Sequence, residues 1–239
     1  LGEEERFALV ASYAFDVSVQ TLFGSLLFGH RLYLVGDDIK KDGVAFVDFL
    51  QTSGITALDC TPAAFSILLS GDMSRCENWL LRVILLAGEA LAPDLVGRFY
   101  VHDGTAGVAL YNAYGPTEAT VYASSYRIGK AELPLLSTIP IGRPLGNYEL
   151  FVLGGEKEPA PMGVVGELCI GGAGLARGYL NNPELTAEKF IQHPYKAGER
   201  LYRTGDLAVF SDTDNPEKGL VFAGRQSEEF KLSNGTWVY

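Results

Sequence analysis

Cysteine is scarce in this sequence of 239 residues, which contains three. Cys60, Cys76 and Cys169 are odd in number, far apart and in no CxxC pair. This pattern argues against a disulfide framework and against a zinc site. We therefore expect three small, buried, apolar side chains in a protein of a reducing compartment, the cytoplasm.

Long apolar runs and clustered positive charge are also lacking. No apolar stretch approaches the ~20 residues of a membrane span, and the first ten residues, LGEEERFALV, have no signal-peptide pattern. The net charge of −10 argues against nucleic acid as the main partner, because phosphate backbones bind clusters of Lys and Arg. The three histidines show no metal-ligand spacing. A nucleotide is not excluded, since it requires only local donors.

Short apolar segments alternate with turns in the first half of the chain. Strands are expected in residues 7–13, 31–35, 54–62, 81–88 and 108–114. Helices are expected in 19–28 (apolar nearly all round, hence buried), 42–51 (ending before Gly54), 63–69 and 92–102. Alternation of strand and helix predicts an α/β fold with a parallel sheet covered by helices. Ligands of such sheets bind at the carboxyl ends of the strands.

The pattern changes near residue 126. From there to residue 223, Gly and Pro are frequent and the expected strands are short, as in YELFVLG, VGELCIGG, LYRTGDLAVF and GLVFAGR. This composition predicts a smaller, antiparallel, barrel-like β lobe. We therefore expect an α/β subdomain over residues 1–125 and a β-rich subdomain over residues 126–223.

The decapeptide YNAYGPTEAT, residues 111–120, combines aromatic rings, a Gly-Pro turn and a carboxylate. Glu118 alone could hold Mg²⁺, which prefers one or two carboxylates together with phosphate oxygens. Thr117 could donate to a phosphate, Tyr114 could stack on a base, and Asn112 offers a donor and an acceptor. Taken by itself, the stretch is better explained as a plain surface turn.

Two later stretches have the same ambiguity. Asp206 follows Thr-Gly in YRTGDL, so its oxygens could accept from a ribose diol, or it could stand in an Asx-type turn between strands. The glycines of residues 166–180 do not follow the GxxxxGK[ST] pattern of a phosphate loop, and turns within a β lobe explain them better.

The order of these motifs along the chain is more specific than any one of them alone. ASYAFDVSVQ, LLAGEAL, YNAYGPTEAT, GELCIGGAGLARGYLNNPELTAEKF, LYRTGDL and FAGR extend from residue 11 to residue 225. The series resembles the adenylation domains of nonribosomal peptide synthetases, members of the adenylate-forming (AMP-binding) superfamily. The resemblance implies that an amino acid and ATP form an aminoacyl-AMP and pyrophosphate. The acyl group then passes to the phosphopantetheine thiol of a carrier-protein domain, often beside other synthetase domains.

The resemblance also implies roles for single residues at the nucleotide. Glu118 would bind Mg²⁺ and Thr117 would contact the α-phosphate, which makes them the expected catalytic pair. The residues expected around the adenine and ribose are Gly88, Glu89, Ala90, Asn112, Tyr114, Asp206, Phe222 and Arg225. Among these, Tyr114 and Phe222 would flank the adenine, and Asp206 would hold the ribose hydroxyls. Family members usually have Tyr where this chain has Phe222.

An amino-acid pocket follows from the same resemblance. Asp16 would pair with the α-ammonium of the substrate, since a buried charge needs a partner; its alternative interpretation is a helix N-cap. The complete expected pocket is Asp16, Val17, Gln20, Asp59, Leu85, Ala87, Ala113, Val121 and Tyr122. Asp-Val-Gln is similar to pockets for proline-like imino acids. Asp59 suggests instead a polar or cationic side chain, or a carboxylate that neighbouring backbone groups satisfy. The amino acid itself stays open.

Two parts of the family pattern are missing. The family's Gly-rich loop with its Lys lies upstream of ASYAFD, and a C-terminal lobe with a second Lys follows the hinge. We expect these 239 residues to be part of a longer protein and to catalyse little alone. Residues 224–239 correspond to the hinge segment, with Ser227 in place of the usual Asp. FKLSNG resembles the acyl-CoA synthetase branch, and a domain inserted near residue 230 is a further hypothesis.

Two other interpretations stay open. An acyl- or aryl-CoA ligase of the same superfamily is favoured by the tail and opposed by Asp16. A non-catalytic pseudo-adenylation scaffold within a megasynthase is opposed by the presence of Asp16, Glu118 and Asp206, none of which a scaffold requires.

Overall fold

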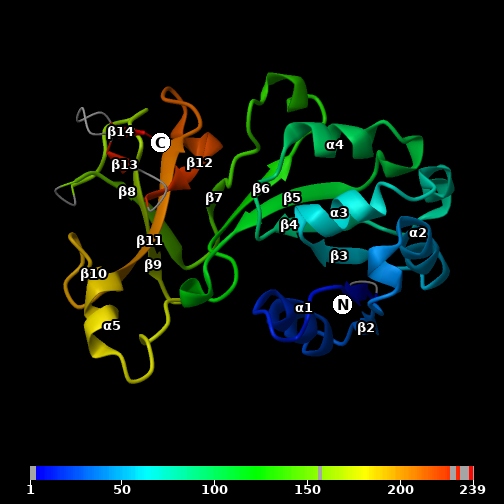
Figure 1. The fold of residues 1–239 in the computed structure, drawn as a ribbon, viewed down its shortest axis with the longest axis horizontal. Coiled ribbons are helices and arrows are strands. Elements are labelled where there is room, and N and C mark those ends of the chain that lie inside the picture. The colour runs from blue at the N-terminus through cyan, green and yellow to red at the C-terminus, as the bar shows by residue number, and fades with distance from the viewer. Residues whose placement is uncertain (1–3, 156–157, 227–229, 232–236, 239) are drawn as a thin grey trace. The chain divides into compact units, whose positions relative to one another are not determined.

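The computed structural model describes residues 4–155, 158–226, 230–231 and 237–238 (Figure 1). Contacts divide the chain into two compact units, Leu1–Ala113 with Arg127–Ile139, and Tyr114–Tyr126 with Pro140–Tyr239. The expected subdomain boundaries at residues 125 and 223 stay predictions. Ser227, named above for the hinge, lies outside the described residues.

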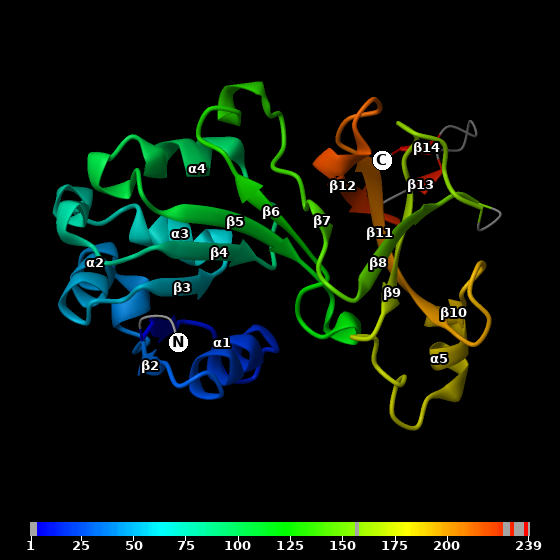
Figure 2. The same cartoon turned by 180° about the vertical axis from the view of Figure 1, so that it is seen from behind.

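The first unit is built on a parallel sheet. Its strands are β1 (Arg6–Leu9), β2 (Arg31–Leu34), β3 (Ala57–Cys60), β4 (Val83–Ala87) and β5 (Ala109–Tyr114). β1 pairs in parallel with β2 and β3, and β3, β4 and β5 follow side by side (Figure 2). The complete sheet order is β2-β1-β3-β4-β5-β6-β7, where β6 (Ser124–Ile128) and β7 (Arg143–Pro144) are antiparallel. The predicted parallel sheet is confirmed.

Helices join the parallel strands. They are α1 (Val17–Leu26), α2 (Gly43–Thr52), α3 (Pro62–Leu68) and α4 (Pro93–Tyr100). The carboxylate of Asp42 accepts the N–H of Ala45 and the hydroxyl of Thr61 accepts the N–H of Ala64, so both side chains cap a helix start. Phe46, Phe65 and Phe99 from α2, α3 and α4 are fully buried in this unit's core.

The expectation that residues 19–28 form a helix buried all round is wrong. α1 exists, but it buries Ser18, Thr21 and Ser25, whereas Phe23 and Leu26 are more than half exposed. The hydroxyl of Ser25 donates to the carbonyl of Thr21 at 2.7 Å, so burying it leaves no unsatisfied polar group. Small hydroxyl side chains therefore provide the packed face of this helix, which apolar content alone does not reveal.

The second unit contains an antiparallel sheet. Its elements are β8 (Tyr148–Leu153), β9 (Gly166–Gly172), α5 (Pro183–Lys189), β10 (Phe190–Gln192), β11 (Arg200–Phe210) and β12 (Leu220–Arg225). The order is β10-β11-β9-β8, and β12 also pairs with the long strand β11. A short pair, β13 (Phe230–Lys231) and β14 (Trp237–Val238), follows. The predicted antiparallel lobe is confirmed, although α5 was not predicted.

The cysteines are buried thiols rather than disulfide partners, as predicted. Burial raises the pKa of the Cys60 thiol well above its usual value, which keeps this thiol protonated. Among the described residues, no helix combines the length and the apolar character that crossing a bilayer requires.

Candidate functional site

The loop after β5 has a tightly defined course. The N–H of Ala123 donates to the carbonyl of Tyr114 at 2.8 Å and closes the loop. Inside it, Thr117–Ala119 forms one turn of 3-10 helix (η4). Thr120 and Val121 both have positive φ, 57° and 71°, which is uncommon for β-branched residues. Such a backbone persists only where its surroundings hold it.

Gly115 makes this closure possible. A Cβ at residue 115 would lie 2.5 Å from the carbonyl oxygen of Val121 and 2.7 Å from the nitrogen of Ala123. We expect Gly115→Ala to lower the free energy of unfolding by about 1–3 kcal/mol, because backbone atoms must move apart. Gly146→Ala is the control, since a Cβ there meets no atom within 4 Å. Chemical denaturation of both variants measures the difference, and equal stabilities would contradict the tight closure.

Glu118 is held from a distant part of the chain. Its Oε1 accepts a hydrogen bond from the Tyr179 hydroxyl at 2.6 Å, and its carbonyl accepts the N–H of Ala176 at 2.8 Å. The Tyr179 hydroxyl lies 3.4 Å from that of Tyr202 in β11. Glu118 is half-buried, whereas Thr117 is exposed at the start of the turn.

The glycine-rich segment after β9 supports the same loop. The Thr120 hydroxyl donates to the carbonyl of Gly174 at 2.6 Å. The Tyr148 hydroxyl, from β8, donates to the carbonyl of Ala119 at 2.7 Å. The glycines thus belong to strand β9 and to the turns that follow it, as the sequence predicted.

Asp206 lies on a β-bulge within β11 and not in a turn between strands. Arg203 is opposite Cys169 and Leu207 is opposite Glu167, so three residues of β11 face one residue of β9. Gly205, with φ of +75°, allows this bend. The Thr204 hydroxyl accepts the N–H of Asp206 at 2.9 Å. The alternative interpretation of Asp206, an Asx-type turn between strands, is therefore wrong, and the bulge sets the direction of the carboxylate.

The carboxylate of Asp206 links two other predicted residues. Its Oδ2 accepts a hydrogen bond from the Tyr114 hydroxyl at 2.6 Å, and its Oδ1 lies 3.3 Å from Nε of Arg225, the residue opposite it in β12. Burial and the adjacent charge of Asp206 raise the pKa of Tyr114, so this hydroxyl remains a donor. Tyr114 and Phe222 both pack on the core formed by Ile141 and its neighbours.

One cavity of about 530 Å³ in the second unit brings three of the predicted polar residues together, whereas Thr117, Tyr114 and Asn112 are not among its lining residues. Glu118, Asp206 and Arg225 line it, although they come from three separate elements. Lys189, at the end of α5, and Tyr202 line it too, and neither was predicted. Their positions depend on how α5 and β11 pack, for which the sequence gives no periodic signal. The volume lies in the range of small-molecule sites.

Residues expected in the amino-acid pocket share one face of the parallel sheet. Asp59 is paired with Leu85 across β3 and β4, and Ala87 is paired with Ala113 across β4 and β5. Because paired positions point to the same side and Leu85 and Ala87 are two residues apart, these side chains lie on one face. Asp59 and the two alanines are buried.

The other expected pocket residues are distributed over both units. Asp16 and Val17 are half-buried at the start of α1, and Gln20 is exposed. Asp16 occupies the N-cap position, but its side chain accepts no capping hydrogen bond. Val121 and Tyr122 are buried in the second unit.

The strand-end residues expected near the adenine differ in exposure. Gly88, Glu89 and Ala90 are exposed after β4, and Gly88 has φ of +86°. The Glu89 carboxylate accepts the N–H of Ala63 at 3.1 Å, at the start of α3. Asn112 is buried, and its amide donates to the carbonyl of Ile139 at 3.5 Å. The role of each at a nucleotide stays a prediction.

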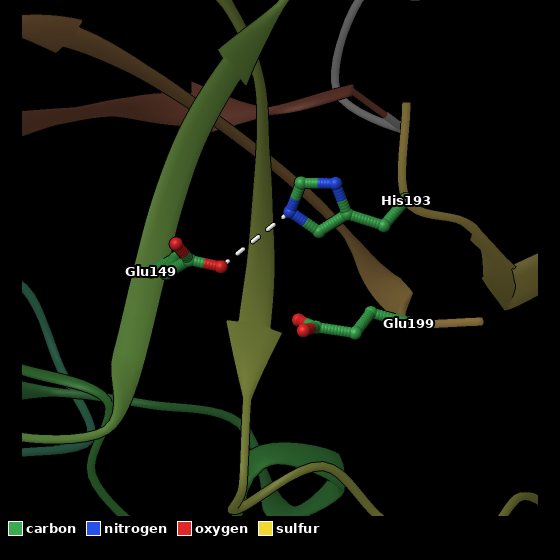
Figure 3. A group of neighbouring side chains, drawn as sticks. All are labelled: Glu149, His193 and Glu199. Carbon is green, nitrogen blue, oxygen red and sulfur yellow. Dashed lines mark ion pairs between the residues drawn. The ribbon is translucent and has the colours of Figure 1, made fainter. Parts of the chain in front are cut away.

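A second polar cluster lies elsewhere in the second unit, where Glu149, His193 and Glu199 have ligand atoms within 4.8 Å of one another (Figure 3). Nδ1 of His193 accepts the N–H groups of Tyr195 and Lys196 at 3.0 and 3.1 Å. The ring proton of the neutral imidazole is therefore on Nε2, 3.4 Å from Glu149, and a protonated nitrogen binds no metal. Lys196, 2.7 Å from Glu149, lowers the pKa of that carboxyl and balances its charge. We interpret this cluster as structural.

Comparisons with known proteins agree with the fold and the motifs. The AMP-binding enzyme family matches residues 1–180. Bacitracin synthase 1 of Bacillus licheniformis is 40% identical over 225 residues, which cover 94% of this chain and 4% of that protein. Tyrocidine synthase 3 of Brevibacillus parabrevis is 38% identical over 230 residues, 96% of this chain and 3% of that protein.

A solved structure extends this similarity to three dimensions. The crystal structure of the nonribosomal peptide synthetase FmoA3 matches 94% of this chain and 24% of its own with a TM-score of 0.82 and 26% identity. The chain spans only 3–4% of the length of the two curated relatives. It belongs to the AMP-binding enzyme family, and it resembles the adenylation domains of nonribosomal peptide synthetases over nearly its whole length.

Proposed function

We propose that the protein activates an amino acid with ATP for nonribosomal peptide synthesis. A carboxylate oxygen of the amino acid bonds to the α-phosphorus, the bond to pyrophosphate breaks, and an aminoacyl-AMP forms. The sulfur of a carrier-protein phosphopantetheine then bonds to the acyl carbon, AMP leaves with the oxygen of the broken acyl–phosphate bond, and the thiol proton is released. The observation that carries this proposal is the cavity shared by Glu118, Asp206 and Arg225, on which the family motifs converge.

The reaction brings two anions together, so the site must offset negative charge and fix geometry. Asp206 accepts from Tyr114 and lies close to Arg225. Because a carboxylate has about four lone-pair positions, Asp206 keeps acceptor capacity for the hydroxyls of a ribose. Tyr114 and Arg225 hold its orientation, so the diol meets a fixed acceptor. Thr117, exposed at the start of η4, would donate to the α-phosphate.

The residues present fit Mg²⁺, which prefers oxygen ligands from one or two carboxylates together with phosphates. Glu118 uses one oxygen to accept from Tyr179 and retains acceptor capacity for a cation. When bound, Mg²⁺ would neutralise charge on the phosphate oxygens.

The substrate class follows from Asp16. A carboxylate at the start of α1 suits an α-ammonium or imino group, which fatty and aryl acids lack. Asp59, buried on the sheet face with Leu85, suits a polar or cationic side chain. The substrate is therefore an α-amino or imino acid.

Exchange of labelled pyrophosphate into ATP tests the proposal in the full-length protein. A panel of amino acids, imino acids and their analogues without the α-amine should give exchange with one or a few amino or imino acids. Exchange with fatty or aryl acids alone would instead indicate a CoA ligase. Absence of exchange with every acid would support a non-catalytic scaffold.

A further inference from the structure

We propose that Tyr179 is a positioning residue for Glu118, which it holds ready to bind the divalent cation that accompanies ATP. This inference rests on the proposed function. It concerns a residue that lies 61 positions from Glu118 in the chain and reaches it through a single hydroxyl.

The hydrogen bonds run in one direction toward the carboxylate. The Tyr179 hydroxyl has one proton, which it donates to Glu118 Oε1 at 2.6 Å. Tyr202 is therefore the donor in any hydrogen bond between the two hydroxyls, which lie 3.4 Å apart, and it also interacts with Glu118 itself. Tyrosine hydroxyls ordinarily titrate near pH ~10, so both keep their protons at neutral pH. Tyr179 thus fixes one oxygen of Glu118, and Tyr202 supports both residues.

The backbone around Tyr179 is built to hold its ring. The N–H of Tyr179 donates to the Thr186 hydroxyl at 2.9 Å, and its ring meets the edge of Phe190 at 5.9 Å between centroids. Gly178, with φ of +143°, lies so close to Thr186 in α5 that a Cβ at residue 178 would be 2.4 Å from the methyl carbon of Thr186. The close approach of Gly178 to α5 therefore sets where the Tyr179 hydroxyl lies.

A fixed carboxylate binds a cation better than a mobile one. Free Glu side chains populate several rotamers, and ordering one of them on binding costs conformational entropy. The hydrogen bond from Tyr179 already orders the Glu118 side chain in the folded protein, before any cation binds. Groups that hydrogen-bond to a metal-binding carboxylate typically contribute 10- to 100-fold to metal affinity or activity.

Mn²⁺ binding provides a test that does not depend on turnover. The full-length protein, saturated with a non-hydrolysable ATP analogue, is titrated with Mn²⁺, and free Mn²⁺ is followed by electron paramagnetic resonance. We expect Tyr179→Phe, which keeps the ring, to weaken Mn²⁺ binding about tenfold, and Tyr202→Phe to weaken it less. Tyr148→Phe is the control, because Tyr148 supports the same loop through the carbonyl of Ala119 and not through Glu118.

The outcomes separate this inference from the proposed function. If Glu118→Gln weakens Mn²⁺ binding and Tyr179→Phe does not, the positioning role is wrong and the metal role stands. If Glu118→Gln leaves Mn²⁺ affinity unchanged, the metal role itself is wrong. Tighter Mn²⁺ binding in Tyr179→Phe would mean that the Tyr179 hydroxyl competes with the cation for Glu118. An equal loss of Mn²⁺ affinity in Tyr148→Phe would mean that the effect comes from general support of the loop. Either result overturns the inference.

A kinetic readout provides a second check. In pyrophosphate exchange, Tyr179→Phe should raise the Mg²⁺ concentration that gives half-maximal rate, while the KM for the amino acid and the rate at saturating Mg²⁺ stay near normal. A parallel rise of both constants would indicate a general fault in folding and would count against the proposal.

Discussion

Glu118→Gln should reduce pyrophosphate exchange by on the order of 100-fold or more in the full-length protein. The substitution keeps the size and the hydrogen bond of the side chain but removes its negative charge. A metal ion at phosphate oxygens is worth several kcal/mol of charge stabilisation in the transition state, and a neutral amide holds Mg²⁺ poorly. The exchange rate at fixed, saturating ATP and amino acid measures the loss.

The control for this variant is Glu184→Gln. Glu184 is an exposed carboxylate in the first turn of α5, in the same unit. Its substitution removes one negative charge but none at the cavity, so exchange should stay near normal. Near-normal exchange in Glu118→Gln as well would contradict the metal role.

The fold was predictable where local chemistry and apolar patterns agree. Asp42 and Thr61 precede helices that they cap, and the largely buried strand β4 is a short apolar run, VILLA. The same approach failed for α1, since its packed face consists of Ser18, Thr21 and Ser25 and its apolar side chains are exposed. An apolar sequence pattern shows how hydrophobic a segment is, but it does not show which face of the helix packs against the rest of the protein.

The site was predictable in its residues but not in its contacts. Glu118, Asp206 and Arg225 come from motifs, and they line one cavity. The bonds that orient them connect residues far apart in sequence, as Tyr114 with Asp206, 92 positions away. The bulge at Gly205, which sets the direction of the Asp206 side chain, lies where β11 pairs with β9 on one side and with β12 on the other. Such contacts depend on strand register, which no short motif encodes.

Tyr179 illustrates the same limit. It lies within the motif GELCIGGAGLARGYLNNPELTAEKF, whose glycines suggested turns only. The role of its hydroxyl follows only from the fold. Gly178 packs on α5, and the Tyr179 hydroxyl then lies 2.6 Å from Oε1 of Glu118. A hydroxyl that donates to a carboxylate across 61 residues is a signal of tertiary structure alone.

Asp16→Ala should shift substrate preference toward acids that lack the α-amine. If Asp16 pairs with the ammonium of the substrate, removing the carboxylate leaves that charge without its partner in a partly desolvated place. Losing one member of a hydrogen-bonded charge pair costs about 2 kcal/mol or more, equivalent to roughly 30-fold in kcat/KM. The analogue without the amine loses nothing, so the ratio of the two kcat/KM values should fall by that factor.

Two further variants separate charge from shape and from general stability. Asp16→Asn keeps the volume at the start of α1 and should also reduce the ratio, because the charge is what pairs with an ammonium. Asp94→Ala removes an exposed carboxylate from the first turn of α4 and should leave the ratio unchanged. Asp16 already makes no capping hydrogen bond to α1, so loss of a cap does not explain an effect on preference. An unchanged ratio in both Asp16 variants would mean that the amine is recognised elsewhere, and the choice of amino acids over other acids would lose its main support.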